Sequence, residues 1–493
     1  MQFTNRRRRH FVFAVVLCLF AAKTAAGATY YVDAAAGNDA NDGIAAPWKT
    51  IQKAFNSAQP GSTVYIRGGT YRERLTLNVS GSASAGYINF MNYGSDVVTL
   101  DATGITASPL IGISNKRYVR IQGLRLQNYI TDAGMGISIN GGSDNVEIRG
   151  NRLTNFRIAA GTTADVIARG VHAWNIPIRI TGNDPTRPND RIIIDGNEIT
   201  NCEEGWAETL TVTGNSTNWE ITNNKISYCQ KGIDAAGHFG KSSNPATDQA
   251  RNGVIRGNEM RNMGLGVGVY VDGARDLVIE RNTISGIADS WGIVISCEHA
   301  GKTASGIIVR NNLIYDNAGG ITVGGWIASY GRVVNSQVLN NTMVGNGTGM
   351  NLTLSSGITF KNNIVSGSNT ALVNMAGNDN SSPFDFNIYH GGGISWKGAW
   401  YGTLSAYRTA TGQDAQSLAV DPLFVGASGK NFHLTASSPA VNRGDPSFGA
   451  AAQEQDIDGQ SRIAGGRVDI GVDEFASSGP TPPAAPTNLR ITP

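Results

Sequence analysis

The amino-acid sequence predicts an all-β fold in which short strands stack as a parallel β-helix, and three observations support this prediction. A six-residue phrase (hydrophobic, any residue, small or polar, Asn, any residue, hydrophobic) recurs eight times. Its asparagines lie 46, 27, 34, 24, 30, 29 and 22 residues apart, a spacing typical of stacked repeats. The chain also has 62 glycines and only 16 % charged residues, which suits a fold made of strands and turns. The repeated asparagines are Asn151, Asn197, Asn224, Asn258, Asn282, Asn312, Asn341 and Asn363.

The repeat explains why its coils must stack. Hydrophobic residues alternate within each unit and would point inward, but a single coil cannot bury them. Neighbouring coils bury one another's apolar side chains and lie about 4.8 Å apart. We expect the repeated asparagine at a turn, where Asn tolerates left-handed backbone angles and can stack into a ladder of amide hydrogen bonds. The alternative, a sandwich of β-hairpins, would show turn signals roughly every 8–12 residues, and this sequence does not.

Residues 1–28 have the pattern of a secretion signal. Arg6–Arg9 form a cationic segment, residues 11–22 an apolar one, and residues 26–28 a small-residue cleavage site. The same arginines also weakly resemble a twin-arginine signal. No later segment is apolar enough to cross a membrane. We therefore expect a secreted or periplasmic protein, and the net charge of +2 does not indicate a nucleic-acid partner. We expect a monomer.

Residues 29–75 are expected to form an N-terminal cap. The stretch Pro47–Phe55 has helical spacing, and a helix there would cover the apolar interior and unpaired strand edges at the open end of the solenoid. The preceding loop offers Asp39, Asn41 and Asp42 as oxygen ligands for a structural calcium ion. It lacks the distal glutamate of a full calcium loop, which favours a purely structural turn rich in Asx residues.

Residues 76–475 are expected to form the β-helix, with closing coils at its C-terminal end. Short strands are expected near Asp421–Phe424, Phe432–Leu434, Ser438–Val441 and Val468–Glu474. The tail, 476–493, is rich in Pro, Ala and Ser, which predicts a disordered linker.

Four cysteines occur, and Cys18 leaves with the signal. Cys202 and Cys229 each follow a repeated asparagine by five residues, so they should stack on adjacent coils. They form either a disulfide or a reduced pair, because parallel side-chain directions do not favour the disulfide geometry. Cys297 is expected to point inward.

Several tracts of the chain resemble secreted right-handed parallel β-helix proteins of the pectate-lyase-like superfamily. The tracts are Tyr30–Asp33, Gly37–Asp39, Pro47–Ile51, Gly69–Glu73, the asparagine ladder and the closing Asp469–Glu474. The resemblance covers nearly all of the mature chain. It implies a right-handed solenoid and a secreted role in carbohydrate chemistry, but not a reaction, because the fold hosts lyases, glycosidases, epimerases and non-catalytic surface proteins.

Four acidic residues are expected on consecutive coils of one face. Glu208 and Asp234 lie 26 residues apart, as do Asp272 and Glu298, and a polar insertion lengthens the interval between the two pairs. Strand alternation points Asp234, Asp272 and Glu298 outward, whereas Glu208 has the opposite parity. Stacked like charges repel, so such a column indicates a bound cation or raised pKa values. The alternative is a solvated polar face with scattered acids.

A pair of carboxylates on adjacent coils suits glycoside hydrolysis. The tracts Gly268–Gly273 and Gly292–Glu298 resemble those of the β-helix β-xylosidases. The resemblance implies a retaining reaction with Asp272 as nucleophile and Glu298 as acid/base. Asp234 would tune the pair or hold a sugar hydroxyl. The expected substrate-binding residues are Glu208, His238, His299, Lys302, Trp291, Trp326 and Arg251.

The main alternative is a polysaccharide lyase that abstracts the proton beside a uronate carboxylate. Its base would be Lys302, His299, His238 or Arg251, with calcium or another cation neutralising the uronate. The mid-chain coils lack the tight aspartate cluster that the calcium-dependent β-helix lyases are expected to have. A uronate epimerase and a non-catalytic carbohydrate-binding protein remain further alternatives. The segments 156–191 and 241–249 would wall off one end of the groove and favour exo action.

Overall fold

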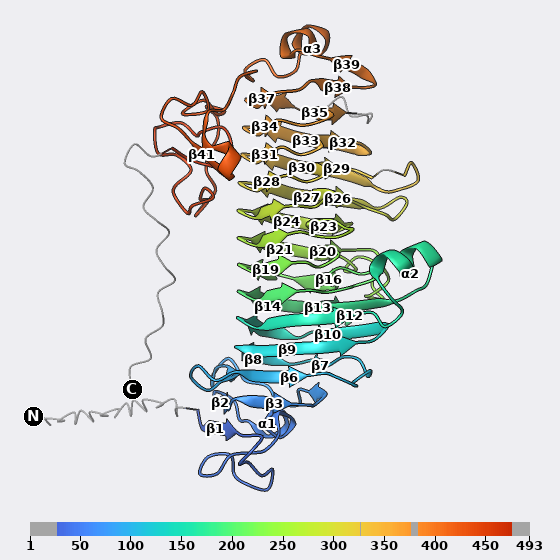
Figure 1. Ribbon diagram of the computed structural model, residues 1–493, viewed down its shortest axis with the longest axis vertical. Coiled ribbons are helices and arrows are strands. Elements are labelled where there is room, and N and C mark those ends of the chain that lie inside the picture. Colours follow the sequence, from blue (N-terminus) through green and yellow to red (C-terminus); the bar gives the residue numbers. More distant parts are fainter. Residues whose placement is uncertain (1–26, 326, 376–382, 476–493) are drawn as a thin grey trace, which may run out of the picture.

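The chain forms a solenoid of three parallel sheets, which confirms the expected parallel β-helix (Figure 1). This computed structural model describes residues 27–325, 327–375 and 383–475. Residues 1–26 of the expected signal therefore lie outside the described residues, as do Trp326 and the expected tail, 476–493. No helix in the described part combines the length and the hydropathy needed to span a bilayer.

The three sheets run the length of the solenoid, and a typical coil contributes one strand to each sheet. The 14-stranded sheet contains β1 (Thr29–Val32), β2 (Thr63–Ile66), β5 (Ile88–Asn92), β8 (Arg117–Gln122), β11 (Asp144–Arg149), β14 (Asn189–Asp195), β17 (Ser216–Thr217), β18 (Glu220–Thr222), β21 (Ala250–Arg256), β24 (Arg275–Glu280), β27 (Thr303–Arg310), β30 (Arg332–Leu339), β33 (Ser355–Lys361) and β36 (Phe384–Asp385). The 12-stranded sheet contains β3 (Gly69–Tyr71), β6 (Val98–Asp101), β9 (Leu124–Ile130), β12 (Arg152–Arg157), β15 (Glu198–Thr200), β19 (Lys225–Ser227), β22 (Glu259–Arg261), β25 (Thr283–Ser285), β28 (Leu313–Tyr315), β31 (Thr342–Val344), β34 (Ile364–Ser366) and β37 (Ile388–His390).

The 13-stranded sheet carries the candidate site. It contains β4 (Leu75–Thr76), β7 (Ile111–Ser114), β10 (Ala133–Asn140), β13 (Trp174–Gly182), β16 (Leu210–Gly214), β20 (Ile233–Ala236), β23 (Val269–Asp272), β26 (Trp291–Ser296), β29 (Gly319–Val323), β32 (Thr348–Leu352), β35 (Ala371–Met375), β38 (Ile394–Trp396) and β39 (Ala399–Tyr401). Inward-pointing residues of its central strands stack in register and are fully buried. One such row is Ile178, Leu210, Ile233, Val269, Ile293 and Ile321. The apolar core therefore runs along the solenoid axis, and the alternate residues of the same strands face outward.

The asparagine ladder forms as expected, at the turn between the 14-stranded and 12-stranded sheets. The buried Asn282 amide donates to Asn312 Oδ1 at 2.9 Å and to Ile255 O at 2.9 Å. Its own Oδ1 accepts from the Asn258 backbone N–H and amide at 2.9 and 3.0 Å. The expected left-handed angle lies one residue earlier, for example at Arg281 with φ of 56°. The small or polar third position of the phrase therefore makes the turn, and the asparagine satisfies the backbone groups that the turn leaves unpaired.

The N-terminal cap contains α1 (Ile51–Ser57), which begins four residues later than the spacing predicted and buries Ile51, Ala54 and Phe55. The loop before it is a network of backbone contacts. Asp39 accepts from the Lys49 and Thr50 backbone N–H groups, and Asp42 accepts from the N–H groups of residues 44–46. Asn41 donates to Pro47 O. The expected calcium ligands thus point to separate backbone partners, which supports the structural turn instead.

The C-terminal part differs from the expected closing coils. The end of the solenoid is covered by the antiparallel pair β38–β39 and by α3 (Leu404–Thr411). The following segment, 412–475, includes β40 (Phe424–Gly426), η1 (Ala427–Gly429) and β41 (Asn431–Leu434), and it lies on the flank of the solenoid beside β28, β31 and β34 (Figure 1).

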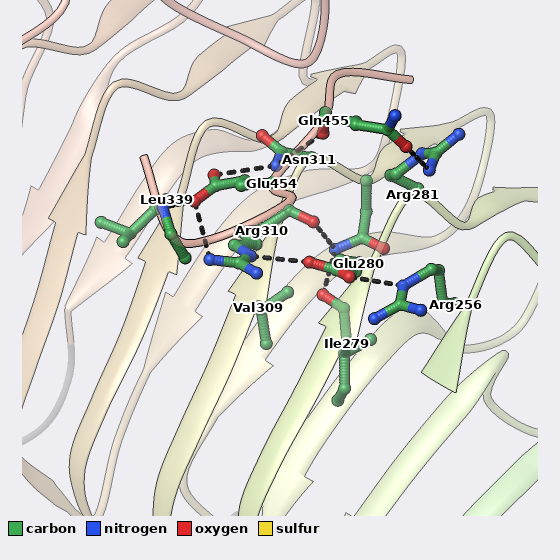
Figure 2. Close-up of polar contacts among 12 residues, drawn as sticks. Arg256, Ile279, Glu280, Arg281, Val309, Arg310, Asn311, Leu339, Glu454 and Gln455 are labelled. Carbon is green, nitrogen blue, oxygen red and sulfur yellow. Dashed lines mark hydrogen bonds and ion pairs between the residues drawn. The ribbon is translucent and has the colours of Figure 1, made fainter. Parts of the chain in front are cut away.

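Ion pairs fix this flank segment. Figure 2 shows Arg310 between Glu280 of the solenoid and Glu454 of the segment, with nitrogen–oxygen distances of 2.7 Å to both. Asn311 donates to Glu454, and Arg281 donates to Gln455 at 2.7 Å. A helix, α2 (Thr163–Arg169), is the remaining insertion and extends one of the early coils.

Candidate functional site

The predicted acids converge on the outward face of the 13-stranded sheet. Asp234 on β20 pairs in register with Thr211 of β16 and Tyr270 of β23. Asp272, at the end of β23, pairs with Ala236 and Ser296. The neighbours of these acids along the strands are fully buried in the core, so both acids point outward as alternation predicted.

Asp272 and Glu298 are in direct contact. The Glu298 backbone N–H donates to Asp272 Oδ1 at 2.7 Å. The Tyr270 hydroxyl donates to Glu298 Oε1 at 2.6 Å. Asp272 is 2 % exposed, whereas Glu298 is exposed in the turn that follows β26. Sequence reasoning missed Tyr270, although its place two residues before Asp272 puts it on the same face.

The four acids share one electrostatic environment. Burial, followed by the charges of Glu298 and Glu208, raises the pKa of Asp272 to about 7. Burial and the charges of the other three acids hold the pKa of Asp234 well above its ordinary range. The pKa of Glu208 is raised by burial, although Lys231 lies 3.9 Å away and opposes the shift. Glu208 therefore belongs to the cluster despite its parity, because it lies in the turn before β16.

Buried polar atoms without a hydrogen-bond partner gather on this face. Native proteins leave few such atoms, so a cluster of them on one surface indicates a place where water or a ligand supplies the partners. The atoms are Arg179 Nε, Thr211 Oγ1, Thr213 Oγ1, Asp234 Oδ1, Ser296 Oγ and His299 Nε2.

Three further predicted residues lie in the turns at the rim of the site. The ring centroids of His238 and His299 are 6.1 Å apart, and Phe239 packs edge-on against His299 at 4.5 Å. Burial lowers the pKa of His238, and Lys302 adds to this effect. Lys302 is exposed. These residues follow β20 and β26, the strands that carry or precede the acids, so they surround one end of the site.

Two predicted residues are not brought to the acids. Trp291 opens β26, five residues before the register partner of Asp272, or roughly 16 Å along the strand. Its ring packs over Gly319, where an added Cβ would lie 2.3 Å from it. Arg251 lies on β21 of the 14-stranded sheet and donates to Asn215 Oδ1 at 2.9 Å. Strand parity excludes the tryptophan, and the corner between two sheets separates the arginine from the acids.

Tyr330 is a second residue that sequence reasoning missed. Burial and the charges of Glu298 and Asp272 raise its pKa, so its phenol lies within electrostatic range of the acid pair. It comes from the long turn after β29, and nothing in the repeat marks such a turn residue.

Two clusters of side chains in the described ranges could hold a metal ion, and both lie away from the four acids. Ligand atoms of Cys202, Glu204 and Cys229 lie within 4.8 Å of one another, and so do those of His433, Asp458 and Asp473. Both cysteines are buried free thiols on adjacent coils, as the spacing predicted, and Cys297 is also free and buried. Neither cluster includes an acid of the candidate site.

Residues 30–177 match the family model described as "Pel9A-like, right handed beta helix region", and residues 239–365 match "Right handed beta helix region". The chain is 30 % identical over 442 residues to the uncharacterized protein YwoF of Bacillus subtilis, which covers 82 % of this chain and 90 % of YwoF. It is 29 % identical over 173 residues to pectate lyase PEL9 of Emericella nidulans, covering 31 % of this chain and 40 % of PEL9.

Among solved structures, the GH136 lacto-N-biosidase from Eubacterium ramulus has a TM-score of 0.49 and 13 % identity, covering 80 % of this chain and 67 % of that one. This likeness concerns the fold alone. Carbohydrate-active proteins of both the lyase and the glycosidase class are thus among the relatives and structural neighbours.

Proposed function

The chain belongs to the right-handed β-helix proteins of the pectate-lyase-like superfamily, in one family with YwoF, and from this premise we propose that it is a glycoside hydrolase whose catalytic acids are Asp272 and Glu298. Its substrate is a poly- or oligosaccharide bound along the outward face of the 13-stranded sheet. We also propose that it works in the periplasm or outside the cell, as the expected signal at 1–28 implies.

The observation that carries the proposal is a pair of acids in opposite environments, joined by the hydrogen bond from the Glu298 backbone N–H to Asp272 Oδ1. Asp272 is buried, its pKa is raised to about 7, and it therefore holds a proton in weakly acidic solution. Glu298 is exposed and accepts a hydrogen bond from the Tyr270 hydroxyl. A buried acid that holds its proton, beside a second and exposed carboxyl group, suits the division between proton donor and nucleophile that glycoside hydrolysis needs.

These environments make Asp272 the proton donor and Glu298 the nucleophile, which is the reverse of the roles that the resemblance to the β-xylosidases implied. Asp272 protonates the glycosidic oxygen as the bond to the anomeric carbon breaks. A Glu298 oxygen attacks that carbon and forms a glycosyl ester. Asp272, now ionised, then takes a proton from water, the water attacks the same carbon, and the ester bond to Glu298 breaks. The product keeps the anomeric configuration of the substrate.

Asp234 assists the pair from the preceding coil. Its raised pKa favours the protonated form, which adds no charge beside Asp272 and can donate to a sugar hydroxyl. Glu208 is held by Lys231 at the edge of the cluster.

A screen for release of reducing ends tests the proposal. The panel contains xylan, arabinan, pectin, alginate and bacterial exopolysaccharides, and the product is also checked for ultraviolet absorbance. On any glycan that is cleaved, Asp272→Asn and Glu298→Gln should each lower kcat by at least about a hundredfold. Glu220→Gln, an exposed glutamate of β18 on another sheet, should leave the rate unchanged. Full activity of both site variants on a cleaved glycan would refute the paired-acid assignment.

A polysaccharide lyase is the second candidate, and one observation favours it. The lowered pKa of His238 keeps its imidazole neutral at the rim of the site, as a proton-abstracting base requires. The local identity to PEL9 agrees with this class. A lyase product carries an unsaturated uronate that absorbs in the ultraviolet, and a hydrolase product does not. Ultraviolet-absorbing product that is lost in His238→Gln and kept in Glu298→Gln would select the lyase, and glycan binding without cleavage would select a non-catalytic role.

A further inference from the structure

One arginine on the site face makes no hydrogen bond to any described residue. Arg179 lies on β13 between Ile178 and Ile180, which are both fully buried in the core, so its side chain points outward. Its Nε is buried without a partner, and within the described ranges no carboxylate lies within 4.0 Å of its guanidinium. Its guanidinium carbon lies 5.7 Å from the centroid of the Trp174 ring. A half-buried group with five donors is thus left without acceptors.

Two other largely buried arginines find acceptors for their terminal nitrogens, although Arg462 Nε, like Arg179 Nε, has no partner. Arg462 is fully buried and donates to the carbonyls of Val472, Asp469 and Gly471. Arg310 is paired with both Glu280 and Glu454. Both of these arginines thus have acceptors at a terminal nitrogen, whereas Arg179 has none among the described residues.

Arg179 belongs to the same outward row as the acids. It pairs in register with Thr211, which pairs with Asp234, which pairs with Tyr270. With strands about 4.8 Å apart, Arg179 lies roughly 10 Å from Asp234 along the solenoid. The hydroxyls of Thr211 and Thr213 are also without partners, and these residues are only 7 % and 2 % exposed. A row of unused donors thus continues from the acids toward the N-terminal end.

A second cation, which forms no ion pair with any carboxylate of the described residues, faces this row. Lys241 comes from the turn after β20 and packs over Gly214, where an added Cβ would lie 2.9 Å from the Lys241 Cβ. Burial and the positive charge of Arg179 lower the pKa of Lys241, and the charge of Asp248 opposes this shift. The protein thus holds two like charges close together and partly away from water, which costs stability, and a bound anion would reduce this cost.

We propose that Arg179 and Lys241, together with the hydroxyls of Thr211 and Thr213, form a subsite for an anionic substituent on a sugar residue neighbouring the bond that is cleaved. The substituent is a carboxylate, a sulfate or a phosphate, because each presents oxygens to the planar guanidinium fork. The place of this sugar relative to the cleaved bond rests on the proposed function. The substrate class is therefore a charged glycan, and neutral glycans of the same backbone are poorer substrates.

Binding of small acidic sugars to the full chain tests the subsite. The probes are glucuronate, galacturonate, glucose 6-sulfate and glucose 6-phosphate, with glucose and galactose as neutral counterparts, in saturation-transfer NMR titrations at constant ionic strength. At least one acidic probe should bind, and both Arg179→Gln and Lys241→Gln should weaken it about tenfold or more. Arg152→Gln, an exposed arginine of β12, is the matched control and should leave binding unchanged. The probe that binds identifies the substituent.

Equal binding of acidic and neutral sugars, no binding of any acidic probe, or acidic binding that survives both substitutions would overturn the subsite. Lys241 lies in a turn, so its variant keeps the test valid if Arg179→Gln unfolds. The titrations are repeated on Glu298→Gln and need no cleavage, so the two proposals fail separately. If acidic sugars bind but no glycan of the panel is hydrolysed, the proposed hydrolase is refuted and the proposed subsite is retained. If charged and neutral glycans are hydrolysed with the same kcat/KM, only the proposed subsite is refuted.

Discussion

Replacing Asp272 by Asn is expected to make the protein more stable in alkaline solution while it abolishes activity. The carboxyl is 2 % exposed, and its pKa is raised from an ordinary 3.8 to about 7. At about 1.4 kcal/mol for each pH unit, ionising this buried group destabilises the folded protein by up to about 4 kcal/mol. Asparagine keeps the oxygen that accepts from the Glu298 N–H and carries no charge, so this cost disappears in the variant.

The sign of the effect fixes its pH window. Below pH 3.8 the carboxyl is protonated in both the folded and the unfolded chain, so it does not affect stability. Between pH 3.8 and about 7 the folded state binds more protons than the unfolded state, so the free energy of unfolding falls as the pH rises. Above about 7 the full loss is present. The variant should therefore match the wild type near pH 4 and exceed it most at pH 8.

Urea unfolding followed by circular dichroism at three pH values measures this difference. Asp276→Asn, an exposed aspartate on β24, is the control and should show no pH-dependent gain. If the midpoints of Asp272→Asn and the wild type differ by the same amount at pH 4 and pH 8, the raised pKa is wrong, and the acid role of Asp272 loses its basis.

Three further outcomes are expected. Asn282→Ala leaves three or more buried ladder groups without partners, at about 1–3 kcal/mol each, so the melting temperature should fall sharply. Asn369→Ala, at an exposed position, is the control and should leave the melting temperature nearly unchanged. Equal melting temperatures of the two variants would contradict the ladder's role. Arg310→Met removes the cation bound to Glu454 and one of the two arginines bound to Glu280, at about 3–5 kcal/mol, so limited proteolysis should release the flank segment 412–475 first. Uniform resistance would speak against this anchoring. Tyr270→Phe removes one hydrogen bond to a charged group, worth about 1.5–3 kcal/mol, so hydrolysis should slow about ten- to a hundredfold, and an unchanged rate would exclude the tyrosine from the chemistry.

The sequence predicts those features that depend on local period and parity. The spacing of the repeated asparagines is sufficient for the stacked coils, because every coil must bury its own alternating apolar residues. Parity alone places Asp234 and Asp272 on the outward face. Strand parity does not predict the place of Glu208, because this residue lies in the turn before β16. The same rule, applied to Trp291, would have excluded this residue from the expected binding residues.

Features that depend on contacts between residues far apart in the sequence could not be predicted from the local repeat. Arg179 lies in a coil lengthened by the α2 insertion, and only the strand register aligns it with Asp234, 55 residues later. Lys241 reaches the same row from a turn of irregular length. The flank segment depends on the pairing of Arg310 with Glu454, 144 residues apart, which no local pattern encodes. The site residues that were missed are those held by tertiary contacts rather than by the repeat.

The pH dependence of kcat/KM on the best glycan of the panel examines the proposed chemistry most directly. If Asp272 donates the proton, the release of reducing ends falls as the pH rises through about 7, because the acid is then lost. A rate that keeps rising through alkaline pH, with ultraviolet-absorbing product, would mean that a base abstracts a proton here instead and would contradict the account.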